Sequence, residues 1–162
     1  MAIAMMAWVI AIPLLGGLTG IRSMTPMAIL CWFAYRGYLD VDGTWASWSA
    51  NRITVIVFAV LAIGELIGDK LPQIPNRTAP FPLIARIIFG GLVGAIAATS
   101  LQGSAIEGIL LGSLSALAGT FFSFHMRHSI VRSQALPDYA AALVEDAMVV
   151  GLAVLALGVI TG

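Results

Sequence analysis

The sequence consists largely of six apolar segments, each ended by glycine, proline or charged residues. A helix needs roughly 20 predominantly apolar residues to cross a hydrocarbon core about 30 Å thick. The segments approach this length and cover residues 3–20, 26–38, 53–71, 83–100, 106–126 and 139–160. We therefore predict an all-α, polytopic membrane protein with about six transmembrane helices, of which 26–38 is short or re-entrant.

The composition supports one membrane domain over residues 1–162. Of all residues, 60% are hydrophobic and 10% are charged, and the mean hydropathy is +1.00, whereas soluble domains carry about a quarter charged residues. The N-terminal stretch "MAIAMMAWVIAI" has no basic n-region and no clear small-residue cleavage site, so we expect the first segment to be a retained helix and not a signal peptide. Cys31 alone cannot form a disulfide within the chain. With zero net charge and no basic run, we expect no nucleic-acid partner, only membrane lipid and a small solute or ion.

The distribution of Lys and Arg predicts the topology. If segment 26–38 crosses, one side of the membrane holds six basic residues and the other only Arg36 and Arg52. The six are Arg22, Lys70, Arg77, Arg86, Arg127 and Arg132. If the segment is re-entrant, the ratio becomes five to three. Because basic residues favour the cytoplasmic side, we predict six crossings with both termini outside.

The stretch "GGLTGIRSMTP", residues 16–26, interrupts the first two apolar segments. Its glycines and proline make one continuous helix across it unfavourable. We predict that the second helix begins at Pro26, the favoured first helical position, with Thr25 as its cap. Trp45 and Trp48 follow this helix and are typical of a membrane–water interface.

Two glycine motifs suggest an internal repeat. "LLGGLTG" begins at residue 14 and "IFGGLVG" at residue 88, an offset of 74, while Glu65 and Glu145 are 80 apart. Halves 1–77 and 78–162 would each hold three crossings, so the second would insert upside down as an inverted repeat. Alternatively, the glycines are close-packing faces, within the chain or between copies of a homodimer. These glycines are Gly16, Gly17, Gly20, Gly90, Gly91 and Gly94.

Depth estimates place several ionisable residues in one layer. At 1.5 Å per residue, Glu65 lies roughly 20 Å from the outer boundary and Glu145 roughly 10 Å from the inner one. Such carboxylates should face the interior, pair with a cation or carry a proton. Of the adjacent acids, we choose Glu145 to line the interior. The predicted substrate or ion site comprises Glu65, Asp69, Glu145, Asp146, Arg22 and His125.

Purely structural roles are the alternative to these assignments. In the alternative, Glu65 has only a structural role, in which its carboxylate is hydrogen-bonded or paired with Arg22. Lys70 is expected to anchor its helix at the membrane–water interface. His125 and His128 are three residues apart, which alone does not predict a metal site. If Glu65 is a working carboxylate, Glu65→Gln should keep its shape and much of its hydrogen bonding and abolish function.

Three stretches resemble a known family. "GIRSMTP", "ELIGDKLPQIP" and "VEDA" are similar to small bacterial membrane proteins grouped as domain of unknown function 4126. The most specific element contains Glu65, Asp69, Lys70 and Pro72. The resemblance implies a bacterial inner-membrane location and supplies no activity.

Three classes of function follow. We favour a transporter or channel for a small solute or ion, with carboxylates in the inner half of the membrane coupling protons or a cation. A structural or accessory protein, with charges that fix helix packing, is the alternative. An enzyme acting on a lipid headgroup, with Glu65 or Glu145 and His125 as acid and base, is disfavoured because no nucleophile motif occurs. We expect no cofactor and no metal. Because six short helices enclose little space, we also expect a homodimer.

Overall fold

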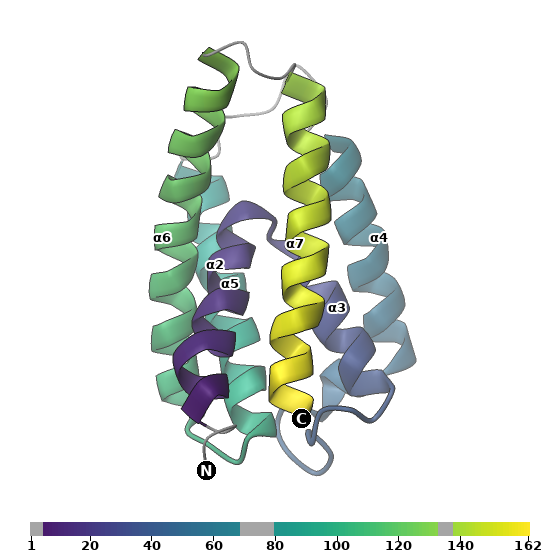
Figure 1. The fold of residues 1–162 in the computed structure, drawn as a ribbon. Coiled ribbons are helices and arrows are strands. Elements are labelled where there is room, and N and C mark those ends of the chain that lie inside the picture. Colours follow the sequence, from purple (N-terminus) through teal and green to yellow (C-terminus); the bar gives the residue numbers. More distant parts are fainter. Residues whose placement is uncertain (1–4, 69–79, 133–137) are drawn as a thin grey trace.

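The computed structural model describes residues 5–68, 80–132 and 138–162. These residues form six α-helices and two short helical turns, with no strand in the described ranges (Figure 1). In chain order the elements are η1 (Ala7–Ala11), α2 (Ile12–Ile21), α3 (Met24–Tyr35), η2 (Ser47–Ala50), α4 (Arg52–Gly68), α5 (Pro80–Ser100), α6 (Ala105–Arg132) and α7 (Asp138–Thr161). The prediction of an all-helical membrane protein is confirmed.

Successive helices alternate in direction, and the two ends of the chain lie at the same end of the bundle (Figure 1). The α2–α3 hairpin is short. Its turn lies well below the upper ends of α6 and α7 in Figure 1, so the chain reverses inside the bundle. This reversal places the residues between α2 and α3 deep among the other helices.

Among the described residues, three helical stretches are long and apolar enough to cross a membrane: Pro80–Ser100, Ala105–Arg127 and Ala142–Thr161. The stretches Ala7–Ile21 and Met24–Tyr35 are apolar but shorter, and α4 has 17 described residues. The stretch Ala7–Ile21 contains a π turn, η1, just before Pro13. Because proline has no N–H group to donate, such local changes in the hydrogen-bond ladder are expected beside it.

Two helix boundaries differ from the sequence prediction. Helix α3 begins at Met24, not Pro26, and its N-cap residue Ser23 makes no side-chain cap bond. Thr25, the predicted cap, lies in the first turn instead. Helix α6 continues to Arg132, beyond its predicted end at residue 126, because polar residues do not stop a helix that leaves the apolar layer.

A stripe of small residues on α6 forms the centre of the packing. Gly108, Gly112, Ala116 and Thr120 recur every four residues and are buried, so they share one helical face. A Cβ added to Gly16 would lie 2.6 Å from the Gly112 carbonyl oxygen, and one added to Gly90 would lie 2.8 Å from the same atom. Both glycine motifs therefore pack against α6 within one chain, where small residues let backbones approach closely.

The other glycines of the two motifs follow the same pattern. A Cβ on Gly20 would lie 2.6 Å from the Thr120 nitrogen, one on Gly94 3.1 Å from the Gly112 Cα, and one on Gly91 2.6 Å from the Ser113 hydroxyl. Gly17 is less tight, with the Ser115 carbonyl oxygen at 3.6 Å. The close approach of α2, α5 and α6 fixes the position of the hairpin.

Helix α4 lies at the edge of the bundle and packs mainly on α3. Within Arg52–Gly68, only Ala62 is buried. Trp48, Phe58 and Phe89 connect this helix to α5, with ring centroids 6.4 and 6.2 Å apart. Because few contacts hold α4, a hydrogen bond between α4 and the hairpin contributes strongly to the position of this helix.

Candidate polar site at the hairpin tip

The turn between α2 and α3 creates a problem of backbone polarity. The last carbonyl groups of α2 and the first N–H groups of α3 have no partner within their own helices. In a lipid environment each unsatisfied group costs several kcal/mol. Charged and hydroxyl side chains from the surrounding helices supply the missing partners.

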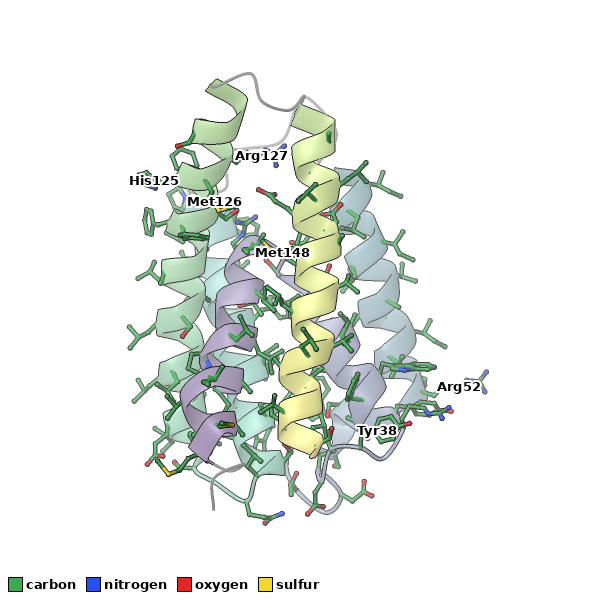
Figure 2. All side chains as sticks on the ribbon, viewed as in Figure 1. Tyr38, Arg52, His125, Met126, Arg127 and Met148 are labelled. Carbon is green, nitrogen blue, oxygen red and sulfur yellow. The ribbon has the colours of Figure 1, made fainter. Side chains whose placement is uncertain are left out.

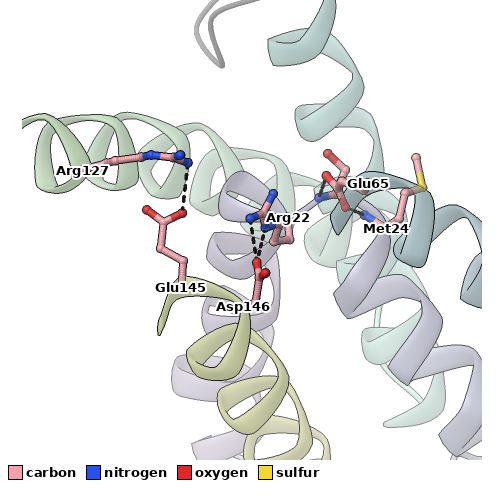
Figure 3. Close-up of polar contacts among 7 residues, drawn as sticks. Arg22, Met24, Glu65, Arg127, Glu145 and Asp146 are labelled. Carbon is pink, nitrogen blue, oxygen red and sulfur yellow. Dashed lines mark hydrogen bonds and ion pairs between the residues drawn. The ribbon is translucent and has the colours of Figure 1, made fainter. Parts of the chain in front are cut away.

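Glu65 of α4 satisfies the start of α3. Its Oε1 accepts a hydrogen bond from the Ser23 N–H at 2.7 Å, and its Oε2 accepts one from the Met24 N–H at 2.9 Å (Figure 3). A carboxylate also complements the partial positive charge at a helix N-terminus. Glu65 thus performs the capping role predicted for Thr25, and it bonds to the backbone next to Arg22 and not to the Arg22 side chain.

The end of α2 is satisfied from two other helices. The Gly20 carbonyl oxygen accepts a hydrogen bond from Arg86 Nη1 of α5 at 2.9 Å and one from the Thr120 hydroxyl of α6 at 3.0 Å. Arg86 is buried, and its positive charge complements the negative end of the α2 dipole. Together with Glu65, these groups make the hairpin tip a capped structure inside the bundle.

Arg22 lies directly at the tip and is fully buried, with a side-chain exposure of 0%. Its Nε donates to Asp146 Oδ1 at 2.8 Å, and its Nη2 lies 2.6 Å from the same oxygen (Figure 3). Asp146, on α7, is 13% exposed. In this low-dielectric setting the two charges interact far more strongly than they would in water.

The neighbouring acid, Glu145, pairs with a different helix. Its Oε2 lies 3.7 Å from Arg127 Nη1 of α6, and the side chains are 8% and 19% exposed, respectively. Adjacent residues on a helix point about 100° apart, so α7 can present Asp146 to α2 and Glu145 to α6. The sequence prediction chose Glu145 alone as the interior acid, whereas both acids have partners inside the bundle.

His125, another predicted site residue, is not part of this layer. His125 is exposed and hydrogen-bonds the Phe121 carbonyl oxygen at 2.8 Å, on the outer side of α6 (Figure 2). Asp69 and Lys70 lie outside the described residues. Within the described ranges, no group of three or more His, Cys, Asp or Glu side chains could hold a metal ion.

Arg22, Glu65, Glu145 and Asp146 therefore come together in one layer with Arg127 (Figure 3). Sequence reasoning used Arg86 and Arg127 only to count charges and missed their partners, because nothing local pairs them with Gly20 or Glu145. It also missed the small-residue stripe of α6. That stripe had a visible signal, since "GILLGSLSALAGT" repeats small residues at helical spacing.

A family model described as "Domain of unknown function (DUF4126)" matches residues 5–159. The chain belongs to the DUF4126 family. No curated protein and no solved structure matched it.

Described residues from each of the three DUF4126-like stretches meet at the hairpin tip. "GIRSMTP" provides Arg22 and the N–H groups of Ser23 and Met24, while "ELIGD" provides Glu65 and "VEDA" provides the two acids. The family match confirms the resemblance found in the sequence, and the described residues that carry it are neighbours in space although they are distant in the chain.

Proposed function

We propose that this DUF4126 protein is a transporter or channel for a small solute or ion, in which carboxylates at the hairpin tip exchange a proton or a cation. The observation that carries the proposal is the fully buried Arg22 held by Asp146 at a chain reversal inside the bundle. Ionisable residues within a membrane are costly and mark substrate or ion pathways. Helix termini that end at membrane depth are also where transporters build their binding sites.

Asp146 is the carboxylate best suited to this exchange. It holds Arg22 on one side, and it is 13% exposed, so it is not sealed from its surroundings. Protonation of Asp146, or binding of a cation to it, removes the charge that fixes Arg22. The α2–α3 hairpin then loses an attachment to α7, and this provides the two states that transport requires.

A structural or accessory role is the second candidate, and the bonds of Glu65 and Arg86 favour it. Both side chains satisfy backbone groups of the hairpin at 2.7–2.9 Å, which would justify buried charges without any transport. The enzyme alternative has less support. Among the described residues, no hydrogen bond or ion pair joins His125 to an acidic side chain.

We also propose a membrane topology and an oligomeric state for the protein. We place the protein in the bacterial inner membrane, with the Arg127 end cytoplasmic and the Arg52 end outside, together with both termini. Arg127 and Arg52 lie at opposite ends of the bundle (Figure 2). If all six segments cross, six basic residues fall on the Arg127 side and two on the Arg52 side, so the positive-inside rule favours this orientation. Helices α2 and α5, the first of each proposed half, run in opposite directions (Figure 1), which supports an inverted repeat. We propose in addition that the protein forms a homodimer.

Flux measurements on proteoliposomes test the transport proposal. The wild-type protein is compared with the double variant Arg22→Met/Asp146→Leu, which replaces the ion pair by apolar side chains of similar volume. Gradients of protons, sodium, potassium, chloride, phosphate and acetate are applied in turn, and an internal pH dye or an ion electrode records the flux. We expect wild-type flux for at least one ion and none from a folded double variant.

Two outcomes would favour the structural role instead. The first is a wild-type protein that carries none of the six ions above the rate of empty liposomes. The second is a double variant with undiminished flux, which would remove the Arg22–Asp146 pair from the pathway. Glu107→Gln serves as a control, because Glu107 is exposed at the start of α6, far along the helix from Arg127.

A further inference from the structure

A lateral groove of about 490 Å³ runs between α6 and α7, with α2 as its floor. The gap between these two helices, with α2 behind it, faces the viewer in Figure 1. Leu14 and Leu18 of α2, Ala118 and Phe122 of α6, and Met148 and Leu152 of α7 line it, and Ser115 is the one polar side chain among its lining residues. Its volume lies within the range of ligand sites, about 300–1,000 Å³.

Charged residues follow the upper end of this groove on all three helices. Ile21, which lines the groove, precedes Arg22 on α2. Arg127 lies five residues after Phe122 on α6, and Glu145 lies three residues before Met148 on α7. In Figure 2, Arg127 extends into the space between α6 and α7, above Met148. The groove is therefore amphipathic along its length, with an apolar body and a polar end that includes a partly exposed arginine.

We infer that the groove binds an acyl chain of an anionic phospholipid, whose phosphate contacts Arg127. The groove lies between helices that are long enough to span a membrane, so its length follows the direction in which lipid chains lie. Arginine offers several N–H donors in a planar fork that matches phosphate oxygens. A cation at the end of the groove fits an anionic headgroup better than it fits the apolar face of another helix. This inference does not depend on transport activity.

Lipid titration followed by native mass spectrometry tests the apolar part of the site. Phosphatidylglycerol and phosphatidylcholine with identical acyl chains are added to the purified full-length protein. We expect phosphatidylglycerol to bind the wild type about fivefold more tightly, as one basic residue near an anionic headgroup implies. Ala118 is exposed and lines the groove, so Ala118→Phe should fill the groove and weaken both lipids by about tenfold. Ala147 is exposed on α7 outside the groove, and Ala147→Phe should leave both affinities unchanged.

A second pair of variants tests the headgroup contact. Arg127→Gln alone would remove the cation that lies 3.7 Å from the buried Glu145 carboxylate, so the double variant Arg127→Gln/Glu145→Gln is used. Its phosphatidylglycerol affinity should fall to that of phosphatidylcholine, while phosphatidylcholine binding stays the same. Arg52→Gln, at the opposite end of the bundle (Figure 2), should retain the preference.

Three results would overturn the inference. The wild type could bind the two lipids equally, which would remove the role of Arg127. Ala118→Phe could leave lipid binding intact, which would place the lipid elsewhere. Finally, Ala118→Phe could dissociate a dimer without releasing lipid, which would make the groove an interface between copies of the chain.

Discussion

Arg22 and Asp146 are 124 positions apart in the chain, yet two guanidinium nitrogens of Arg22 lie 2.8 and 2.6 Å from one carboxylate oxygen of Asp146. The contact joins the hairpin turn to the last helix. Arg22 is fully buried. If either charge is removed alone, the other charge stays in a low-dielectric environment and loses this ion pair. The pair therefore couples the position of the hairpin tip to the charge state of α7.

Arg22→Met and Asp146→Leu, made singly, should each strongly destabilise the protein, because each removes one charge of a buried ion pair. A loss of about 3–5 kcal/mol is typical of such single removals. The double variant should recover most of this loss, since an apolar pair of similar volume carries no desolvation cost. Unfolding of the three variants in detergent gives a double-mutant cycle. Single-variant effects that simply add in the double variant would show that the two side chains do not interact.

Glu65→Gln should destabilise the hairpin, because both carboxylate oxygens accept backbone hydrogen bonds. Glutamine has one acceptor and presents its NH₂ group to the other backbone donor. A cost of about 1–3 kcal/mol follows from one unsatisfied buried donor. This revises the expectation that the amide would keep much of the hydrogen bonding of Glu65.

Hydrogen exchange at the amides of Ser23 and Met24 measures the effect of Glu65→Gln directly. At least one of the two amides should exchange faster than in the wild type. Glu107→Gln, at an exposed position, should leave their exchange unchanged and alter stability by less than about 0.5 kcal/mol. Unchanged amide protection in Glu65→Gln would mean that the carboxylate does not cap α3.

Gly112→Ala should separate α6 from α5. An added Cβ would lie 3.2 Å from the Gly94 Cα and closer still to the Gly90 carbonyl group, and these are backbone atoms that cannot rotate away. We expect a loss of about 1–3 kcal/mol, as for other overpacked sites. Gly151 has no atom within 4 Å of an added Cβ, so Gly151→Ala should be neutral or stabilising by up to about 1 kcal/mol. Equal thermal stability of the two variants would contradict the close packing on α6.

Ser47→Cys and Ser129→Cys should be labelled from opposite sides of the membrane. Both serines are exposed, and they lie at opposite ends of the alternating helices. Cys31, which is buried, is replaced by alanine in the background. A membrane-impermeant maleimide applied to intact cells should modify position 47, and position 129 should react only after permeabilisation. Modification of both positions in intact cells would exclude this topology.

The sequence predicted the helices well because their signals are local. Length, hydropathy, glycine and proline determine where a chain can form apolar helices, and the six α-helices follow the six apolar segments. The depth estimate from helical rise also brought Glu65 and Glu145 to one layer with Arg22, as Figure 3 shows. Local signals do not determine how each helix is rotated about its own axis.

Rotation and packing decided which charges meet. Only the folded bundle placed Glu65 against the N–H groups of Ser23 and Met24, 42 and 41 positions away, and turned His125 to the outside. The physical reason is that apolarity is a property of each segment, whereas a hydrogen bond or ion pair needs two groups within about 3–4 Å. The sequence by itself determined a helical membrane protein with a polar layer. The close packing of α2 and α5 on the small residues of α6 decided that this layer is the capped tip of a hairpin.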